Sequence, residues 1–293
     1  MSLKVVWKGS FPSYWDISRW AALRGEYLFL LIKNSGHRKL LIQSLADKRY
    51  SFDIPTSANV ILGFYKDSII IGRLQDARSH INLTNLVAYN FLNKELQWRT
   101  KGNFLYEKYK IPYINQEGYF KVGKDFINLE TGKITTDVKL YGSEINLSPF
   151  KKNWFKGSIG NTLYFFDQNQ SIYLTDNQIN IMKSLRLENL KKVSNTIDGD
   201  FSIRSNNLLQ NTNLMDALIN KDKIVWVNNE NNLVIYSLKD SLTRILTNPN
   251  KAYDLCLGSI NEKYILIYGI KNYNAGSLLV FDLEDTNESK GKK

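Results

Sequence analysis

Histidine and cysteine, which often carry nucleophilic or metal chemistry in proteins, are scarce in this sequence. The 293 residues include two histidines, His37 and His80, and one cysteine, Cys256. A zinc site built from several histidine or cysteine ligands therefore cannot be assembled from one chain. Cys256 lies in the apolar stretch Tyr253–Leu257, with no histidine near it in the sequence. This setting favours a buried thiol in a strand over a nucleophile.

Each histidine is close to an arginine, in a segment that we expect to connect two strands. The two segments are Ser35-Gly36-His37-Arg38 and Arg78-Ser79-His80-Ile81. Arginine presents a planar fork of donors that matches phosphate or carboxylate. If both connections lie on one face, His37, Arg38, Arg78 and His80 form a small anion-binding surface. The alternative is that both are solvated hairpin tips.

A second candidate surface combines basic and aromatic residues, Lys151, Lys152, Trp154 and Lys156. Cations interleaved with aromatics suit stacking on nucleic-acid bases or contact with an anionic membrane surface. The formal net charge of +11, from 39 basic and 28 acidic residues, would also attract a polyanion. The lysines are scattered, however, so a generally basic composition and a strand start with solvated lysines are the alternatives.

Other patterns that would indicate catalysis are missing from the sequence. Asp282 and Asp285 occupy positions at which hairpins place turn-capping carboxylates. There is no Gly-x-Ser-x-Gly elbow, and the glycines near 123 and 160 lack phosphate-loop spacing. We therefore predict no catalytic residue, no metal ligand and no cofactor, and a protein that is not an enzyme.

The rest of the chain repeats one pattern, in which two short strands flank a polar turn. In residues 86–101, the apolar run Leu86–Phe91 is followed by a polar break and then by the alternating Leu96–Trp98. Equivalent apolar positions, which we term anchor residues, mostly lie about 38 to 46 residues apart, close to the spacing expected for propeller blades. The anchor residues are Leu45, Phe91, Leu129, Leu174, Leu238 and Leu283.

This spacing predicts an all-β protein, a single β-propeller of six four-stranded blades, with seven blades as the alternative. We expect residues 1–285 to form the propeller and residues 286–293 to be a disordered polar tail. Pairing of the N-terminal strand near Lys4–Phe11 into the last blade would close it and remove exposed edges. Residues 188–223 interrupt the repeat and are predicted to be an insertion or a degenerate blade, with a short helix within 208–220 as one interpretation.

The chain carries no pattern typical of export or membrane insertion. Its first residues show no secretory signal, and the longest apolar run, Tyr27–Ile32, is too short to cross a bilayer. A lone cysteine cannot form an intrachain disulfide. These features predict a soluble cytoplasmic protein without a transmembrane segment.

The hairpin at 86–98 and the turn Glu130-Thr131-Gly132-Lys133 resemble the quinoprotein-type blade repeat, which has a Thr-Gly-Lys turn and a closing Leu-Trp. The chain also resembles an uncharacterised bacterial domain-of-unknown-function family of cytoplasmic propellers. In that family a strand like Tyr14-Trp15-Asp16-Ile17 precedes two blades, and a histidine, here His80, precedes the repeat. The likeness covers mainly residues 14–138, and the turns at 46–48, 92–94 and 239–241 depart from Thr-Gly-Lys. It implies a propeller fold and no activity.

Three functions follow from these observations. Our prediction is a non-catalytic scaffold that binds another protein through loops on one rim, with residues 188–223 making contact, because a rigid scaffold carries variable loops here without a catalytic constellation. The alternative is binding of nucleic acid or an anionic surface through the basic and aromatic residues. A second alternative is an enzyme with its site at the central channel. The sequence leaves the partner and the oligomeric state open.

Overall fold

The computed structural model describes most of the chain as strands and turns. The described residues are 3–11, 21–34, 37–47, 51–55, 60–74, 82–105, 118–122, 125–135, 155–159, 162–167, 169–176, 178–191, 217–248, 251–271 and 275–286. The strand pairs within these ranges are antiparallel. No helix in this part of the chain is long and apolar enough to span a bilayer.

The strands form six sheets, which we number in chain order. Sheet 1 consists of β2 (Ala21–Arg24), β3 (Tyr27–Asn34), β4 (His37–Ser44) and β5 (Ser51–Pro55). Sheet 2 consists of β6 (Val60–Tyr65), β7 (Ser68–Leu74), β8 (Asn82–Asn90) and β9 (Glu95–Leu105). Sheet 3 consists of β10 (Tyr119–Val122), β11 (Asp125–Asn128) and β12 (Ile134–Thr135). Sheet 4 consists of β13 (Phe155–Ile159), β14 (Thr162–Phe166), β15 (Ser171–Thr175) and β16 (Ile181–Arg186). Sheet 5 consists of β17 (Ala217–Ile219), β18 (Lys223–Val227), β19 (Leu233–Ser237) and β20 (Thr243–Leu246). Sheet 6 consists of β21 (Asp254–Ile260), β22 (Tyr264–Lys271), β23 (Ala275–Thr286) and β1 (Leu3–Phe11).

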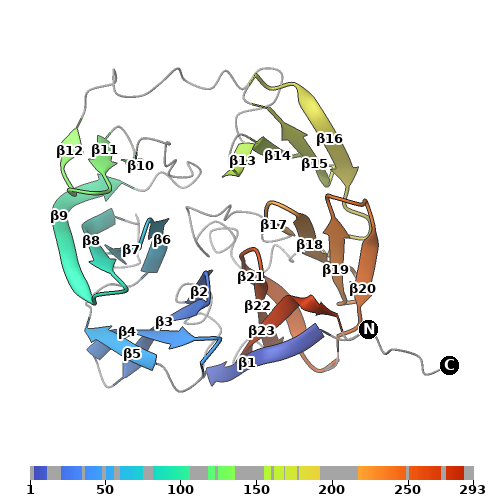
Figure 1. Ribbon diagram of the computed structural model, residues 1–293, viewed down its shortest axis with the longest axis horizontal. Coiled ribbons are helices and arrows are strands. Elements are labelled where there is room, and N and C mark those ends of the chain that lie inside the picture. The colour runs from blue at the N-terminus through green and yellow to red at the C-terminus, as the bar shows by residue number, and fades with distance from the viewer. Residues whose placement is uncertain are drawn as a thin grey trace.

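The six sheets lie around a common centre (Figure 1). Strands β2, β6, β17 and β21 lie on the inside, while β5, β9, β16, β20 and β1 lie on the outside (Figure 1). Inner strands of neighbouring sheets contact one another, since β2 contacts both β6 and β21, and β21 also contacts β17. The chain passes from each sheet to the next around this centre.

Adjacent sheets pack face to face, so a single strand contributes to two cores. In β3, Leu28 and Leu30 face sheet 6, while Phe29 faces sheet 2, where its ring centroid lies 4.8 Å from that of Phe64. Successive side chains of a strand point to opposite faces. Burial on both faces therefore explains why β3 is a continuous apolar run and does not alternate with polar residues.

The same two-faced burial corrects the helix predicted within 208–220. Ala217 and Ile219 pack toward sheet 4, and Leu218 packs toward sheet 6, so the end of this segment is the inner strand β17. A helix would place these three residues around a single turn and could not fill both cores. Residues 192–216 lie outside the described residues.

Five of the six anchor residues share one hydrogen bond, which explains the sequence repeat. The anchor amide, near the end of one strand, donates to the carbonyl of the residue just before the preceding strand, and the anchor side chain packs inward. The donor and acceptor pairs are Leu45 to Glu26, Phe91 to Asp67, Leu129 to Gly118, Leu238 to Asp222 and Leu283 to Lys263, at 2.7–3.0 Å.

Leu174 does not share the position of the other anchor residues. It lies inside β15, and the turn that follows is capped by Asp176, two residues later. In sheets 2 and 3 the capping residues Asn90 and Asn128 come directly before the anchor residue. In sheet 4 the anchor residue and the capping residue therefore do not have the relative positions that they have in sheets 2 and 3, although the sequence spacing predicted the same arrangement.

Sheet 3 is joined to sheet 2 through the segment that resembles the quinoprotein repeat. The indole Nε1 of Trp98 donates to the Leu129 carbonyl at 2.8 Å, and the Thr100 hydroxyl donates to the Gly132 carbonyl. Gly132 has a φ of +69°, and a Cβ there would lie 2.7 Å from Trp98 Cδ2. The Thr-Gly-Lys turn is thus the surface on which Trp98 packs.

We predict that Gly132→Ala destabilises the protein more than Gly25→Ala. Gly25 also has a positive φ, +52°, but nothing lies within 4 Å of a Cβ built there. The control should therefore cost only the backbone term, about 1–2 kcal/mol. Gly132→Ala should cost roughly 1–3 kcal/mol more, because Trp98 must move. Chemical denaturation measures both, and equal losses would contradict the packing of Trp98 on Gly132.

Candidate functional site

The structure describes few of the residues that the sequence singled out for binding. His37 and Arg38 begin β4, where their backbones pair with Asn34 and Lys33, and Lys156 lies in β13, but the side chains of these three lie outside the described part. The remaining candidates lie entirely outside the described residues: Arg78, His80, Lys151, Lys152 and Trp154. Both predicted binding surfaces therefore stay predictions.

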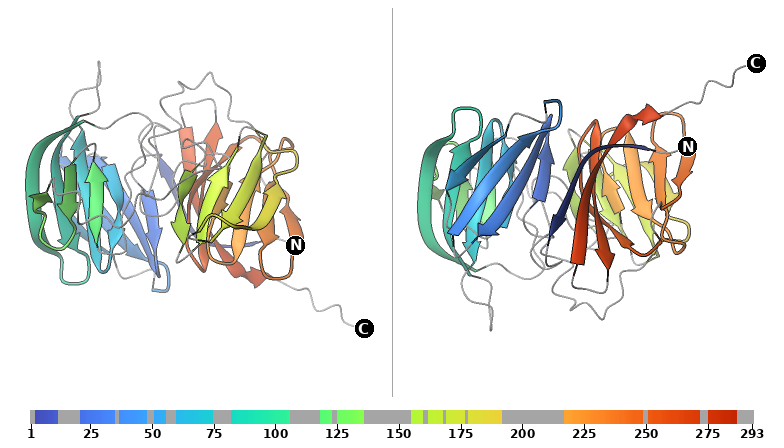
Figure 2. Two further views of the ribbon diagram at one scale, coloured as in Figure 1. Left: turned by 90° about the horizontal axis from the view of Figure 1, so that it is seen from above. Right: turned by 90° about the horizontal axis from the view of Figure 1, so that it is seen from below.

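The antiparallel order places two kinds of turn at opposite ends of the sheets (Figure 2). The turns between second and third strands lie at the same end as the connections from one sheet to the next, and we call this end the connecting face. The β3–β4 turn that precedes His37 and the β18–β19 turn both belong to it.

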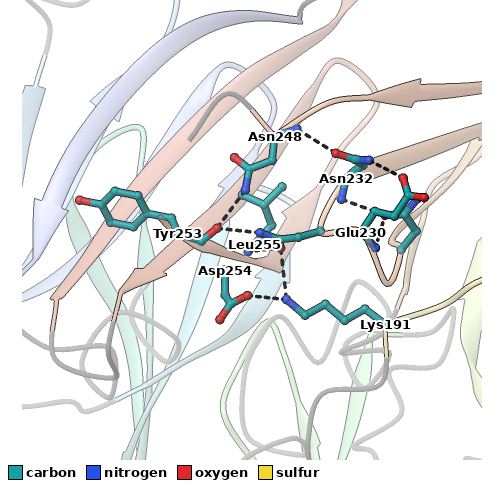
Figure 3. A network of polar contacts seen from close by, with 9 residues as sticks. Lys191, Glu230, Asn232, Asn248, Tyr253, Asp254 and Leu255 are labelled. Atoms are coloured by element: carbon teal, nitrogen blue, oxygen red, sulfur yellow. Dashed lines mark hydrogen bonds and ion pairs between the residues drawn. The ribbon is translucent and has the colours of Figure 1, made fainter. Parts of the chain in front are cut away.

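Three chain segments meet at the connecting face in a network of polar contacts (Figure 3). They are residues 188–191 after β16, the β18–β19 turn at 228–232 and the β20–β21 connection at 248–255. Asn231 is central, because its Nδ2 donates to the Tyr253 carbonyl at 2.8 Å and its Oδ1 accepts from the Leu255 amide at 2.8 Å and from Lys191 Nζ at 3.2 Å. One amide side chain thus joins all three segments.

Further asparagines extend this network along the β18–β19 turn. Asn248 Nδ2 donates to the Tyr253 carbonyl at 2.9 Å, and the Asn248 amide donates to Asn232 Oδ1 at 3.1 Å (Figure 3). Asn232 Nδ2 in turn donates to Glu230 Oε2 at 3.1 Å. We call Lys191, Asn228, Asn231, Asn232, Asn248 and Asp254 together the asparagine network.

The β18–β19 turn is one of three copies of the same five-residue turn. In each copy an Asp or Asn side chain accepts the backbone amides two and four residues later, and the fourth residue has a positive φ. The three copies begin at Asp167, Asp176 and Asn228. Hydrogen bonds from Asn180 lower the pKa of Asp176. These carboxylates serve as backbone caps, a use that differs from acid–base catalysis.

The charged groups of the network form an ion pair at its surface. Lys191 Nζ lies 2.7 Å from Asp254 Oδ1, with 28% of the lysine side chain and 70% of the aspartate side chain exposed. An exposed pair of this kind contributes little stability. Among the described residues no three His, Cys, Asp or Glu side chains lie together as metal ligands. The arrangement therefore holds loops in place and leaves charged groups facing solvent.

The sequence contains a local signal for this site. Asn228-Asn229-Glu230-Asn231-Asn232 is a dense run of residues that cap turns and tolerate a positive φ, and Asn231 has a φ of +63°. The distant partners, Lys191 and Asn248, have no local signal, because only the packing of sheets 4, 5 and 6 brings them to the turn.

One buried hydroxyl in sheet 4 takes no part in any hydrogen bond in the described part of the chain. Tyr164 is fully buried between sheets 4 and 5, its Oη has no partner there, and burial raises the pKa of the phenol well above its usual value. We predict that Tyr164→Phe increases the free energy of unfolding by about 1 kcal/mol, because it removes an unsatisfied polar group without changing shape. A decrease of this size in chemical denaturation would contradict the assignment.

The asparagine network can be tested through Asn231. We predict that Asn231→Ala lowers the free energy of unfolding by roughly 2–4 kcal/mol, because it loses three hydrogen bonds and places alanine at a positive φ. Asn231→Gly should recover the backbone part only. Asn169→Ala, an exposed asparagine in the matching β14–β15 turn, is the control. If Asn231→Ala costs no more than this control in urea denaturation, the three segments are not held together by Asn231.

Comparison with known proteins adds the following. No family model and no curated protein matches the chain, so the resemblance to an uncharacterised propeller family stays a prediction. Similar solved structures include the β-propeller domain of Cps50 (Swd1) from Myceliophteria thermophila, with 8% identity, 94% of this chain and 99% of that chain covered, and a TM-score of 0.47. The WD40 β-propeller domain of Doa1 is also similar, with 9% identity, 95% of this chain and 96% of that chain covered, and a TM-score of 0.41. BamB from Moraxella catarrhalis has 10% identity, with 95% of this chain and 100% of that chain covered, and a TM-score of 0.38.

Proposed function

We propose that this protein is a closed β-propeller of six blades, and that it is a non-catalytic scaffold that binds another protein through the connecting face. The six sheets support the blade count. Closure is supported by β1, which pairs with β23 so that Val5 lies opposite Phe281 and Trp7 opposite Val280. Both ends of the chain thus contribute to sheet 6, as a closed propeller requires.

Contacts at the opposite end of the sheets also support closure. Asn220 Nδ2 donates to the Asn261 carbonyl at 2.7 Å, and Asn261 Nδ2 donates to the Gly25 carbonyl at 3.0 Å, which links the first turns of sheets 5, 6 and 1 in series. Lys263 and Tyr264 both bind the Glu26 carboxylate, at 3.2 and 2.7 Å. The Tyr264 side chain and the Glu26 carboxylate raise the pKa of Lys263. The last sheet is therefore tied to the first.

The observation that carries the binding proposal is the fixed shape of the connecting face. The asparagine network holds three segments through side chains that cap the backbone, so exposed groups such as Glu188, Asn229, Glu230, Lys251 and Asp254 stand on ordered turns. A surface held in one shape before binding loses less entropy when a partner docks. Binding without chemistry is the use that this arrangement favours.

The connection that leaves Lys191 and returns at Ala217 starts and ends at this face. Leu190 bridges to Asn228, and the Lys191 amide donates to the Val227 carbonyl at 2.9 Å, so the departure point is fixed by the β18–β19 turn. This placement supports the expectation of contact for residues 188–191, whereas 217–219 form the buried strand β17 and the turn that follows lies at the opposite end of the sheets. The polyanion alternative would use Lys151, Lys152, Trp154 and Lys156, on whose side chains the structure offers no support.

Site-specific photo-crosslinking tests the proposal. A benzoylphenylalanine at Asn229, on the connecting face, should give a defined crosslinked protein in cells, whereas the same residue at Asn93, exposed in the β8–β9 turn of the opposite face, should not. Both positions are exposed asparagines in turns, so they match in residue type and in accessibility. Crosslinks from Asn93 alone, or none from either position, would reject the connecting face as the binding surface.

A further inference from the structure

Four large apolar side chains are exposed on the outer strands of two neighbouring sheets. Ile181 and Met182 begin β16 and are 55% and 56% exposed, while Leu242 precedes β20 and Ile245 lies within it, at 56% and 59%. Single exposed apolar residues are common on protein surfaces. Ile181, Met182 and Leu242 all lie where an outer strand begins, which is the same end of sheets 4 and 5, and exposed apolar residues near one another indicate an interaction surface.

A polar contact joins β16 to the β19–β20 turn. Lys183 Nζ donates to Ser241 Oγ at 3.1 Å and to the Leu238 carbonyl at 3.3 Å, and it lies 5.0 Å from the centroid of the Tyr236 ring. Met182 and Leu242 are the chain neighbours of Lys183 and Ser241. The apolar residues of β16 and β20 therefore flank one contact, and we call Ile181, Met182, Leu242 and Ile245 the β16/β20 surface.

Strand β16 is also the edge of its sheet. The strand order of sheet 4 ends at β16, so one row of its backbone N–H and C=O groups points away from β15, on the outside of the molecule (Figure 1). Edge strands are usually protected by charge, as in β1, where Lys4 and Lys8 are exposed. Strand β16 instead begins with two exposed apolar residues and is a suitable template for a further strand.

The charges around this edge select the partner. Both charged residues of β16 are basic, namely Lys183 and Arg186. The nearby carboxylate of Asp240 accepts the Leu242 amide at 3.2 Å, and a hydrogen bond from the Ser237 hydroxyl lowers its pKa. A strand that carries acidic residues would find opposite charge along the edge, whereas a basic strand would be repelled.

We infer that β16 binds an extended, acidic segment of a partner protein, which adds to sheet 4 as a further strand. The side chains of that segment pack on the exposed apolar residues of β16 and pair with Lys183 on one face of the sheet and with Arg186 on the other. Backbone hydrogen bonds supply affinity, and the apolar and acidic side chains supply selectivity. This surface is separate from the connecting face, so either site can be disproved without the other.

Three peptide probes test the inference on the whole protein. The first alternates valine with glutamate, the second has lysine in place of glutamate, and the third is the first with alternate backbone amides N-methylated. The glutamate peptide should bind saturably by fluorescence anisotropy, with an affinity that falls as salt is raised. The other two should bind on the order of tenfold more weakly or not at all, because one reverses the charge and the other blocks strand pairing.

A pair of variants locates the binding. Met182→Glu should weaken the glutamate peptide on the order of tenfold, while Val5→Glu, which changes an exposed apolar residue on the edge strand β1, should leave it unchanged. Bound peptide should also slow amide hydrogen exchange in residues 181–186. Equal binding by Met182→Glu, unchanged exchange in β16, or equal binding of the N-methylated peptide would overturn strand addition at this edge.

Discussion

Burial of each sheet on both of its faces is the constraint on which the rest of the structure depends. In the described part of the chain no helix covers a sheet, and the apolar side chains of sheets 1, 5 and 6 pack on a neighbouring sheet at both faces. Each fully buried leucine or phenylalanine contributes on the order of 1.5–3 kcal/mol. Phe29 and Leu28, adjacent in β3, stabilise two different interfaces, so a change in one sheet affects two neighbours.

Side-by-side packing leaves many turns at two ends of the molecule, and these turns satisfy their own backbone groups. Asp167, Asp176 and Asn228 cap matching turns with their side chains, and the anchor amides of five sheets donate to the preceding turn. Polar side chains used in this way are fixed, and their carboxylates and amides are occupied. The described turns at both ends are therefore held by their own polar side chains.

The two proposed surfaces use different physical properties. The connecting face is polar, is held by amide side chains such as Asn231 and Asn248, and would bind through shape and exposed charge. The β16/β20 surface is apolar with a basic border and an open strand edge. Lys183 serves the second surface by joining two sheets at their outer strands, where the inner-strand contacts do not reach.

The sequence by itself determined the class of structure and its repeat. Alternating and continuous apolar runs specify strands locally, and the anchor residues recur because each sheet needs the same buried side chain and the same turn bond. Prediction from the sequence was wrong where the local apolar pattern and the packing of the sheets disagree. The segment ending at Ile219 has helical spacing but fills two cores as a strand, and Leu174 has the right residue type in a different register.

Only the tertiary structure decided which residues meet at the sites. Asn231 contacts Lys191 and Leu255, and Lys183 contacts Ser241, across separations of up to 58 residues that no local pattern encodes. Exposure of Met182 and Ile245 was equally hidden, because an apolar residue in a strand is expected to be buried unless its strand is known to be an edge. Sequence periodicity reports the conformation of a strand, whereas its neighbours are set by the packing of whole sheets.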